Sequence, residues 1–198
     1  MINPAVLLSL LLVQAFPAGT KAIPVLKCDT LTNHILLFST DTLQQPSASL
    51  EEVIVNPLSY LMITDTAAGP DEFAGRLGRD YSELNTLINH SHLTAGRIMT
   101  FYHTATYPLI FDAAIAVDNF PPKVTGGIRI NKLNGGIAIV AHYKGPYDQI
   151  GIAYSFIHDW LKTHNKAEVS APFEVYINSP GVVNNVNDLR TDVYQLFR

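Results

Sequence analysis

The chain has 198 residues, of which 47% are hydrophobic and 15% charged, and its formal net charge is −4. This length suits one substantial domain with a proper core, or at most two small ones, and the composition excludes an intrinsically disordered chain. The 13 lysines and arginines form no basic run or basic helical face. We therefore expect no nucleic-acid binding by this chain alone, since such binding needs a clustered positive surface. The single cysteine, Cys28, can form no intrachain disulfide.

The N-terminus is strongly apolar over Ala5–Val13, and no charged side chain precedes Lys21. The run is too short for a comfortable membrane span. It resembles the core of a secretory signal, with small residues at Ala18, Gly19 and Ala22, but it lacks the basic residue that normally precedes such a core. Two interpretations stay open. The segment either exports or anchors the protein, or it is a buried helix or strand of a cytoplasmic protein, so membrane association is expected only through the N-terminus.

Residues 1–52 are interpreted as an N-terminal segment ahead of the main domain. Within it, Asn33–Ser39 is typical of a strand, whereas Gln44–Ser49 is rich in polar residues and proline and predicts a loop or linker. The main domain is expected over residues 53–198.

The main domain contains the same order of predicted elements twice, at about 57–120 and 134–198. In each unit a strand is followed by a Gly-Pro pair, a helix and two more strands. The first unit is expected to form a strand at Tyr60–Thr64, a helix from Asp71 to about Ile88, and strands at Met99–His103 and Phe111–Val117. The second is expected to form a strand at Ile137–Tyr143, a helix at Tyr147–His164, and strands at Pro172–Ile177 and Thr191–Phe197.

This pattern predicts an α+β fold of duplicated β-α-β-β units with pseudo-two-fold symmetry. Each unit alone has a sheet face that it cannot bury. Two units side by side, with both helices on one face, would bury that face and leave the opposite face as a shared concave groove. Because pockets commonly form at such interfaces, we expect a ligand groove between the repeats.

The residues of the second unit resemble a known family, the GyrI-like small-molecule-binding domain, which is also the effector-binding domain of many bacterial transcription regulators. The similar segments are His142–Tyr147, a helix ending near Trp160-Leu161, Glu174–Pro180 and Arg190–Tyr194, with Leu84–Ile88, Gly96 and Phe101–His103 in the first unit. The resemblance covers about Val53 to Arg198, and it rests on the whole succession, since no single motif is specific.

The resemblance implies a small lipophilic molecule, often aromatic or cationic, as the partner bound between the repeats for sensing or sequestration. Some stand-alone members of the family hydrolyse cyclopropane-containing toxins, so a hydrolase of such electrophiles is the alternative. A gyrase-inhibitor-like role in protein interaction is a further one. Residues 1–52 contain no segment with the helical pattern and positive charge of a DNA-binding helix-turn-helix, so the chain resembles the stand-alone type.

Glu174 is the principal site candidate. Strand alternation puts Phe173, Val175 and Ile177 on one face, which we expect to pack on the helices, and sends Glu174 and Tyr176 into the groove. A carboxylate beside an aromatic hydroxyl in a half-apolar cleft would have a raised pKa and would suit a cationic ligand or acid–base catalysis, with Tyr176 assisting in a hydrolase. The ordinary alternative is an exposed strand glutamate. The resemblance supports the first interpretation, because family members place a ligand-contacting acid in this groove.

Thr100 and Tyr102 are the first-unit counterparts of Glu174 and Tyr176, so the acid is expected on one side only. Aromatic residues that offer flat contact to a ligand extend the candidate set. The full set of ligand-binding candidates is Glu174, Tyr176, Tyr102, Tyr107, Tyr143, Tyr147, Trp160 and Tyr194. For Trp160, on the apolar helix stripe, core packing is the alternative. No metal site and no cofactor are predicted, because the His90-Ser91-His92 pair has no evident third ligand.

Overall fold

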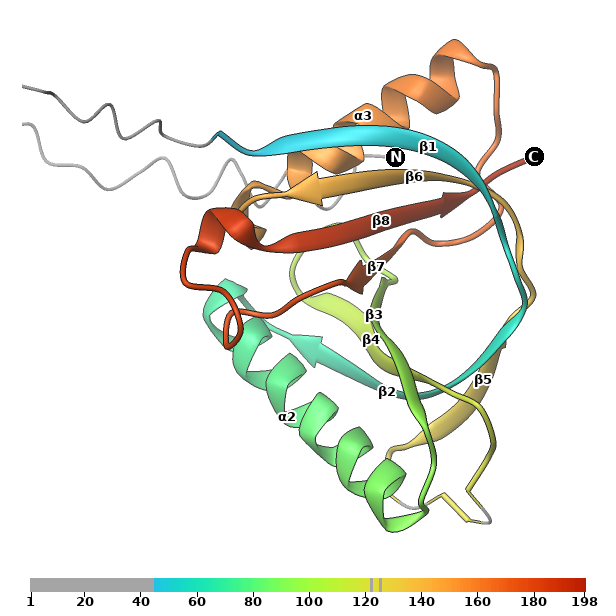
Figure 1. The fold of residues 1–198 in the computed structure, drawn as a ribbon, viewed down its shortest axis with the longest axis vertical. Helices are drawn as coiled ribbons and strands as arrows, with labels where there is room; N and C mark the ends of the chain where they lie inside the picture. The colour runs from blue at the N-terminus through green and yellow to red at the C-terminus, as the bar shows by residue number, and fades with distance from the viewer. Residues whose placement is uncertain (1–44, 122, 125) are drawn as a thin grey trace, which may run out of the picture.

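The computed structural model describes residues 45–121, 123–124 and 126–198 (Figure 1). The predictions for the apolar N-terminus, for Cys28 and for a strand at Asn33–Ser39 lie outside these residues. The elements are, in chain order, β1 (Ser47–Val55), β2 (Leu58–Ala67), α2 (Pro70–His90), β3 (Ala95–Tyr102), β4 (Leu109–Val117), β5 (Arg129–Leu133), β6 (Gly136–Lys144), η1 (Tyr147–Gln149), α3 (Gly151–Thr163), β7 (Phe173–Tyr176), η2 (Val186–Asp188) and β8 (Arg190–Leu196).

The strands form one antiparallel sheet in the order β1-β6-β8-β7-β3-β4-β2-β5. The predicted α+β class with helices on one sheet face is confirmed. The orders β2-α2-β3-β4 and β6-α3-β7-β8 lie on either side of the central β3–β7 pair. This arrangement agrees with a duplication, which stays a prediction.

Two edge strands were not predicted. β1 pairs with β6 from Ser47–Lys144 to Val55–Gly136, so the expected loop over Gln44–Ser49 is wrong from Ser47 onward, and residue 53 falls inside the strand. The local composition of this segment favours a loop, but Ala48 and Leu50 pack against the core beneath α3. β5 is mostly exposed, and its charged, weakly alternating sequence gives no strand pattern. Edge strands need only one partner, so their sequences are less constrained than those of central strands.

The two helices cover different halves of the sheet. α2 contacts β2 and β4, and α3 contacts β1, β6 and β8, which leaves the central strands β3 and β7 between them (Figure 1). α2 starts with Pro70 after an extended Gly69, as expected from the Gly-Pro pair. The second predicted helix is divided into the short turn η1 and α3. Neither helix of the described part combines the length and hydropathy that a membrane span requires.

The sheet curls because its two ends are tied together by short connections (Figure 1). Asn56-Pro57 links the edge strand β1 to β2, and the Asn134-Gly135 turn links β5 to β6. The two connections touch: Gly135 has φ 77°, and a Cβ there would collide with the carbonyl oxygen of Val55. Only glycine fits such a position without strain. The helix-free face therefore becomes the inside of a curl.

The inside of the curl is filled by a stack of aromatic rings. Ring centroids are 5.2 Å apart for Tyr60 and Phe101, 5.0 Å for Phe101 and Phe173, and 5.0 Å for Phe173 and Tyr194. Val175 belongs to the same cluster. The expectation that Phe173 and Val175 pack on the helices is therefore wrong. The two-residue alternation holds, but the curl supplies a second core on the helix-free face.

Replacing Phe173 by alanine is expected to lower the free energy of unfolding by about 3–5 kcal/mol, because it removes a buried ring from the middle of the stack. Denaturant titration of both proteins measures this loss. Ile177→Ala, at a side chain that is 53% exposed, is the control and should change stability by less than about 0.5 kcal/mol. A loss below about 1 kcal/mol for Phe173→Ala would contradict the assigned stack.

Candidate functional site

A cavity of about 540 Å³ lies between α2 and α3 on the helix-covered face. Because neither helix covers β3 and β7, these two strands form its floor. Its lining residues are Pro70, Phe73, Ala74, Leu77, Gly78, Tyr81, Ile98, Tyr102, Ala105, Thr106, Tyr107, Leu109, Tyr147, Asp148, Ile150, Tyr154, Glu174, Tyr176 and Ser179. The sequence predicts a ligand groove on the opposite, helix-free face, so this cavity between the two halves was not expected. The helix-free face carries a cavity of its own, which is described below.

Glu174 lies at the bottom of this cavity. The register of β3 and β7 sets it directly opposite Thr100, and its exposed fraction is 4%. Tyr154 of α3 donates a hydrogen bond of 2.9 Å to its Oε1. Tyr176 and Tyr102 donate to its Oε2 at 2.8 and 3.1 Å. Three phenol groups from two strands and one helix thus converge on a single buried carboxyl group.

The hydrogen bonds continue from this carboxyl group toward α2. The Tyr176 hydroxyl is 3.0 Å from Oγ1 of Thr100, which is 2.8 Å from the hydroxyl of Tyr81. Tyr81 donates in turn to the carbonyl oxygen of Met99 at 2.9 Å. The central strands and both helices are therefore joined by one polar network under an otherwise apolar cavity.

Burial raises the pKa of Glu174 above its ordinary value, because removal from water disfavours the charged form. Hydrogen bonds from Tyr176, Tyr154 and Tyr102 lower this pKa and offset part of the effect. Burial, followed by the proximity of Glu174, also raises the pKa of each of these tyrosines well above its usual value. The phenols are therefore neutral donors.

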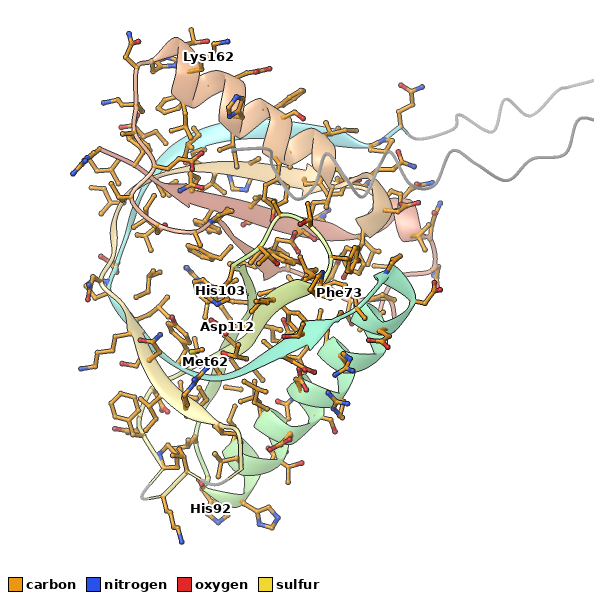
Figure 2. All side chains as sticks on the ribbon, turned by 180° about the vertical axis from the view of Figure 1, so that it is seen from behind. Met62, Phe73, His92, His103, Asp112 and Lys162 are labelled. Carbon is orange, nitrogen blue, oxygen red and sulfur yellow. The ribbon has the colours of Figure 1, made fainter. Side chains whose placement is uncertain are left out.

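The walls of the cavity are apolar. Phe73 lies between the start of α2 and the strands, with its ring centroid 6.1 Å from that of Tyr102 and 5.0 Å from that of Phe111 (Figure 2). Among the described residues, the lining contains no lysine, arginine or histidine, and its only acidic side chains are Glu174 and the exposed Asp148. The Tyr107 hydroxyl is buried and has no hydrogen-bond partner among the described residues. A ligand in the cavity would meet aromatic surface and one buried acid.

Five of the predicted site residues line this cavity: Glu174, Tyr176, Tyr102, Tyr107 and Tyr147. The other three lie elsewhere. Tyr143 is buried under α3, where its hydroxyl donates to the carbonyl oxygen of Pro146. Trp160 stacks on His164 and packs on Phe197 at the far side of α3. Tyr194 belongs to the aromatic stack on the helix-free face.

Sequence analysis missed the contribution of α2 to the site. Phe73, Leu77 and Tyr81 line the cavity, but the sequence places no site candidate on this helix, because it predicts the groove on the other face. Tyr154 of α3 is also absent from the predicted site residues, yet its hydroxyl group donates a hydrogen bond to Glu174. The apolar stripe of each helix could have indicated this contribution. Where a helix covers only part of its sheet, the residues at the edge of its apolar stripe face the uncovered strands.

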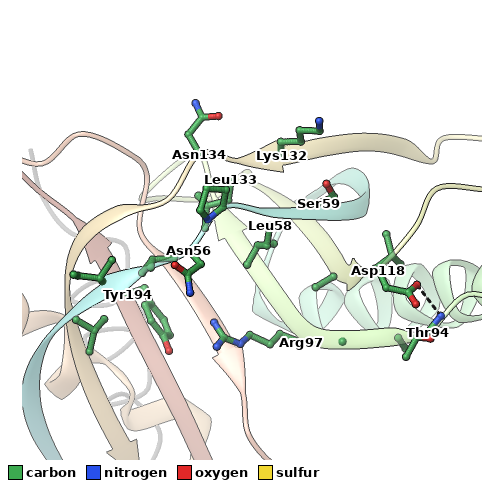
Figure 3. Close-up of a pocket in the computed structure, with 18 of the residues that line it drawn as sticks. Asn56, Leu58, Ser59, Thr94, Arg97, Asp118, Lys132, Leu133, Asn134 and Tyr194 are labelled. Atoms are coloured by element: carbon green, nitrogen blue, oxygen red, sulfur yellow. Dashed lines mark hydrogen bonds between the residues drawn. The ribbon is translucent and has the colours of Figure 1, made fainter.

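A larger cavity of about 920 Å³ lies on the helix-free face beside the connections between the halves (Figure 3). Arg97 points across it toward Tyr194, and Asp118 on its wall accepts a hydrogen bond of 3.1 Å from the Thr94 amide (Figure 3). Its lining carries charges of both signs and no buried carboxyl group. The cavity between the helices is therefore the stronger candidate for a specific site.

No group of three or more His, Cys, Asp or Glu side chains in residues 45–121, 123–124 and 126–198 could hold a metal ion. Asp112 and Asp192 occupy matching places in β4 and β8 and hold their neighbours in position. Asp112 lies 2.7 Å from His103 and Asp192 lies 2.8 Å from His142. These contacts belong to the helix-free face and not to the cavity between the helices.

Comparison with known proteins identifies the fold. The family model of the GyrI-like small molecule binding domain matches residues 79–196. The crystal structure of the EcmrR C-terminal domain superposes with a TM-score of 0.64 at 18% identity, over 77% of this chain and 98% of that chain. In the EcmrR–DNA complex the TM-score is 0.66 at 18% identity, over 80% of this chain but only 59% of the EcmrR chain.

Two further solved structures share the fold. A hydrolase from Listeria innocua has a TM-score of 0.56 at 11% identity, over 75% of this chain and 91% of its own. SAV2435 bound to tetraphenylphosphonium has a TM-score of 0.52 at 15% identity, over 76% of this chain and 94% of its own. At these identities the likeness establishes the fold alone. None of the curated proteins compared with the chain gives a significant match.

The raised pKa of Glu174 predicts a specific dependence of stability on pH. The folded protein holds this proton more tightly than the unfolded chain, so the contribution favours folding below the ordinary value of 4.5 and is lost as pH rises through the raised pKa. The difference in unfolding free energy between wild type and Glu174→Gln should therefore fall with rising pH, by at most about 1.4 kcal/mol per pH unit.

Denaturant titrations of both proteins from about pH 4 to about pH 8 measure this difference. Glu52→Gln makes the same substitution at an exposed position of β1 and is the matched control. A wild-type profile parallel to that of Glu174→Gln would show that the carboxyl group is not perturbed by folding.

Proposed function

The chain belongs to the family of GyrI-like small molecule binding domains, and we propose that its cavity between α2 and α3 binds a lipophilic, aromatic cation for sensing or sequestration. The observation that carries this proposal is the buried carboxyl group of Glu174, which lies at the bottom of an apolar, tyrosine-lined cavity.

The charge of the cavity favours a cation. Glu174 can carry a negative charge at the bottom, and no lysine, arginine or histidine in the lining competes for it. A positive ligand near Glu174 would therefore gain an attraction in a poorly solvated place, where such attraction is strong. An anion would meet repulsion from the same carboxylate.

The walls favour an aromatic or otherwise lipophilic ligand. Phe73, Tyr81, Tyr102, Tyr147 and Tyr176 supply aromatic surface, and Tyr147 and Tyr176 lie edge to face with centroids 5.6 Å apart. Aromatic faces attract cations as well as apolar groups. The volume of about 540 Å³ is in the range of sites for drug-sized molecules. The structure of SAV2435, whose fold this chain shares, contains one such compound, tetraphenylphosphonium, bound to the protein.

Tetraphenylphosphonium is expected to bind to the protein, and Glu174→Gln to weaken this binding about 30-fold or more, because the variant removes the only buried acid that can face the cation. Isothermal titration calorimetry at about pH 8 measures both affinities.

Two controls define this result. Glu52→Gln changes the same functional group on an exposed strand position and should leave the affinity unchanged. Tetraphenylmethane derivatives without charge test whether the site selects charge or shape. Equal affinity of wild type and Glu174→Gln for the cation would reject Glu174 as its binding partner.

A second candidate function is hydrolysis of a cyclopropane-containing or similarly electrophilic compound. The raised pKa of the buried Glu174 carboxyl favours it, since acids and bases of hydrolases are often tuned in this way. A protonated Glu174 would donate its proton to the atom that leaves as its bond to the electrophilic carbon breaks. Water would add its hydroxyl group at that carbon, and the remaining proton of the water would return to the Glu174 carboxylate. The product would be heavier than the substrate by one water molecule.

Mass spectrometry of such compounds incubated with catalytic amounts of protein separates the two functions. A hydrolase gives more than one product molecule per protein, and Glu174→Gln should slow turnover by about 10²–10⁴-fold. A binding protein returns the compound unchanged. A gyrase-inhibitor-like protein-interaction role would instead be indifferent to Glu174→Gln.

A further inference from the structure

The network around Glu174 can be described by two numbers: the oxygen–oxygen contacts within it and the hydroxyl hydrogens available to form hydrogen bonds in those contacts. Six contacts join the carboxyl group, five hydroxyl groups and one carbonyl oxygen. The hydroxyl groups are those of Tyr81, Thr100, Tyr102, Tyr154 and Tyr176. Each hydroxyl group has one hydrogen to donate. Five hydrogens therefore serve six contacts when Glu174 is ionised, and one pair of oxygens faces each other without a hydrogen.

A proton on Glu174 completes the network. The carboxylic acid then donates to Tyr176, Tyr176 donates to Thr100, and Thr100 donates to Tyr81, which donates to the Met99 carbonyl. Tyr102 and Tyr154 still donate to the carboxyl oxygens. All six contacts are hydrogen bonds in this state only. An unsatisfied buried polar contact costs about 1–3 kcal/mol, so the count favours the protonated form.

We propose that the ligand-free cavity stores one proton on Glu174, held there by the hydroxyl chain through Thr100 and Tyr81, and that a bound cation displaces it one for one. The proposal rests on the proposed function of this cavity. Glu174 becomes the counter-charge of the ligand, and its proton passes to the solvent. Thr100 and Tyr81 are then positioning residues that set how strongly the site prefers a cation to a neutral ligand.

No positively charged side chain of the described residues lining the cavity could replace the proton as the partner of Glu174. The titratable side chains that face this part of the cavity are Tyr81 on α2, Tyr102 on β3, Tyr147 and Asp148 on η1, Tyr154 on α3 and Tyr176 on β7. Among these residues none carries a positive charge. Asp148, the one acid among them, is exposed to solvent.

The exchange makes cation affinity depend on pH in one direction. Below the pKa of Glu174 in the free protein, each unit of falling pH should weaken cation binding about tenfold, since one proton must leave for each cation bound. Binding of a neutral ligand of the same shape should change little over the same range.

Some single substitutions remove the need for a proton on Glu174 and others keep it, as judged by the numbers of contacts and hydroxyl hydrogens that remain. Thr100→Val removes two contacts and one hydrogen, which leaves four contacts and four hydrogens without the Glu174 proton. Tyr81→Phe also leaves four of each. Tyr154→Phe removes one contact and one hydrogen, so five contacts still need the Glu174 proton.

These variants distinguish two reasons for a proton on Glu174: the hydrogen bonds of the hydroxyl chain, and the burial of the carboxyl group alone. If burial alone holds the proton, the more apolar valine at position 100 raises the pKa of Glu174 further. If the hydroxyl chain holds it, Thr100→Val lowers that pKa and the stored proton is lost. Thr100→Ser keeps the hydroxyl group and serves as the matched control.

The experiment is calorimetric titration of tetraphenylphosphonium into wild type and variants, in pairs of buffers with different ionisation enthalpies, from about pH 5 to about pH 8. The wild type, Thr100→Ser and Tyr154→Phe should each release up to one proton per cation bound. Thr100→Val and Tyr81→Phe should release at most a small fraction of one. Circular dichroism of each variant confirms that it is folded, and Tyr81→Phe replaces Thr100→Val if the latter is not.

Infrared spectroscopy of the free proteins gives a readout without ligand. The carbonyl band of a protonated carboxylic acid should disappear in Glu174→Gln and weaken in Thr100→Val. If tetraphenylphosphonium binds without proton release, or if Thr100→Val releases as many protons as wild type, the exchange is rejected while the proposed function stands. If the cation does not bind, the proposed ligand class fails. The infrared band then decides alone: a carboxylic-acid band that is present in the wild type and absent in Glu174→Gln supports the stored proton, and a wild type without this band rejects it.

Discussion

The antiparallel pairing of β3 with β7 is the contact on which the rest of the structure depends. It joins the two halves of the sheet and sets Thr100 opposite Glu174, on the strands that neither helix covers. A carboxyl group in this place is removed from water, so it needs hydrogen-bond donors at short range. Tyr102, Tyr154 and Tyr176 supply them from three different elements.

The same pairing makes the site asymmetric. Thr100 and Glu174 lie directly opposite each other, and Tyr81 of α2 contacts the first while Tyr154 of α3 contacts the second. On one side a tyrosine meets a hydroxyl group, and on the other side a tyrosine meets a carboxyl group. A site that could have carried two acids carries one, which limits electrostatic repulsion within the cavity and gives a bound molecule one preferred end.

The curl of the sheet decides which face is open. The short connections at Asn56-Pro57 and Asn134-Gly135 bring the sheet ends together, and Phe101, Phe173 and Tyr194 fill the inside. The helix-covered face keeps its gap because each helix packs on outer strands. The helices therefore form the walls of the site, and the face that lacks them combines an aromatic core with the larger cavity beside the connections.

The sequence by itself determined the class of fold, the order of six central strands and two helices, and the residues on each strand face. These follow from apolar periodicity, which is a local property of the chain. Strand alternation also placed Glu174 and Tyr176 on one face of their strand, and the structure brings both together with Tyr102. The edge strands β1 and β5 escaped it, since a strand with a single partner needs little of the alternating pattern.

Only the tertiary structure decided on which face the cavity lies and which aromatic residues reach it. Alternation separates Phe173 from Glu174 but does not say which of them faces the helices, because both faces of this sheet are buried. Tyr143 and Trp160 are aromatic, as expected of ligand contacts, yet they pack at the core beneath α3. Tyr194 packs on Phe173 and lines the cavity on the helix-free face. Tyr81 and Thr100 joined the site through the register of distant segments, and register is fixed by the packing of the whole sheet, not by any local stretch of sequence.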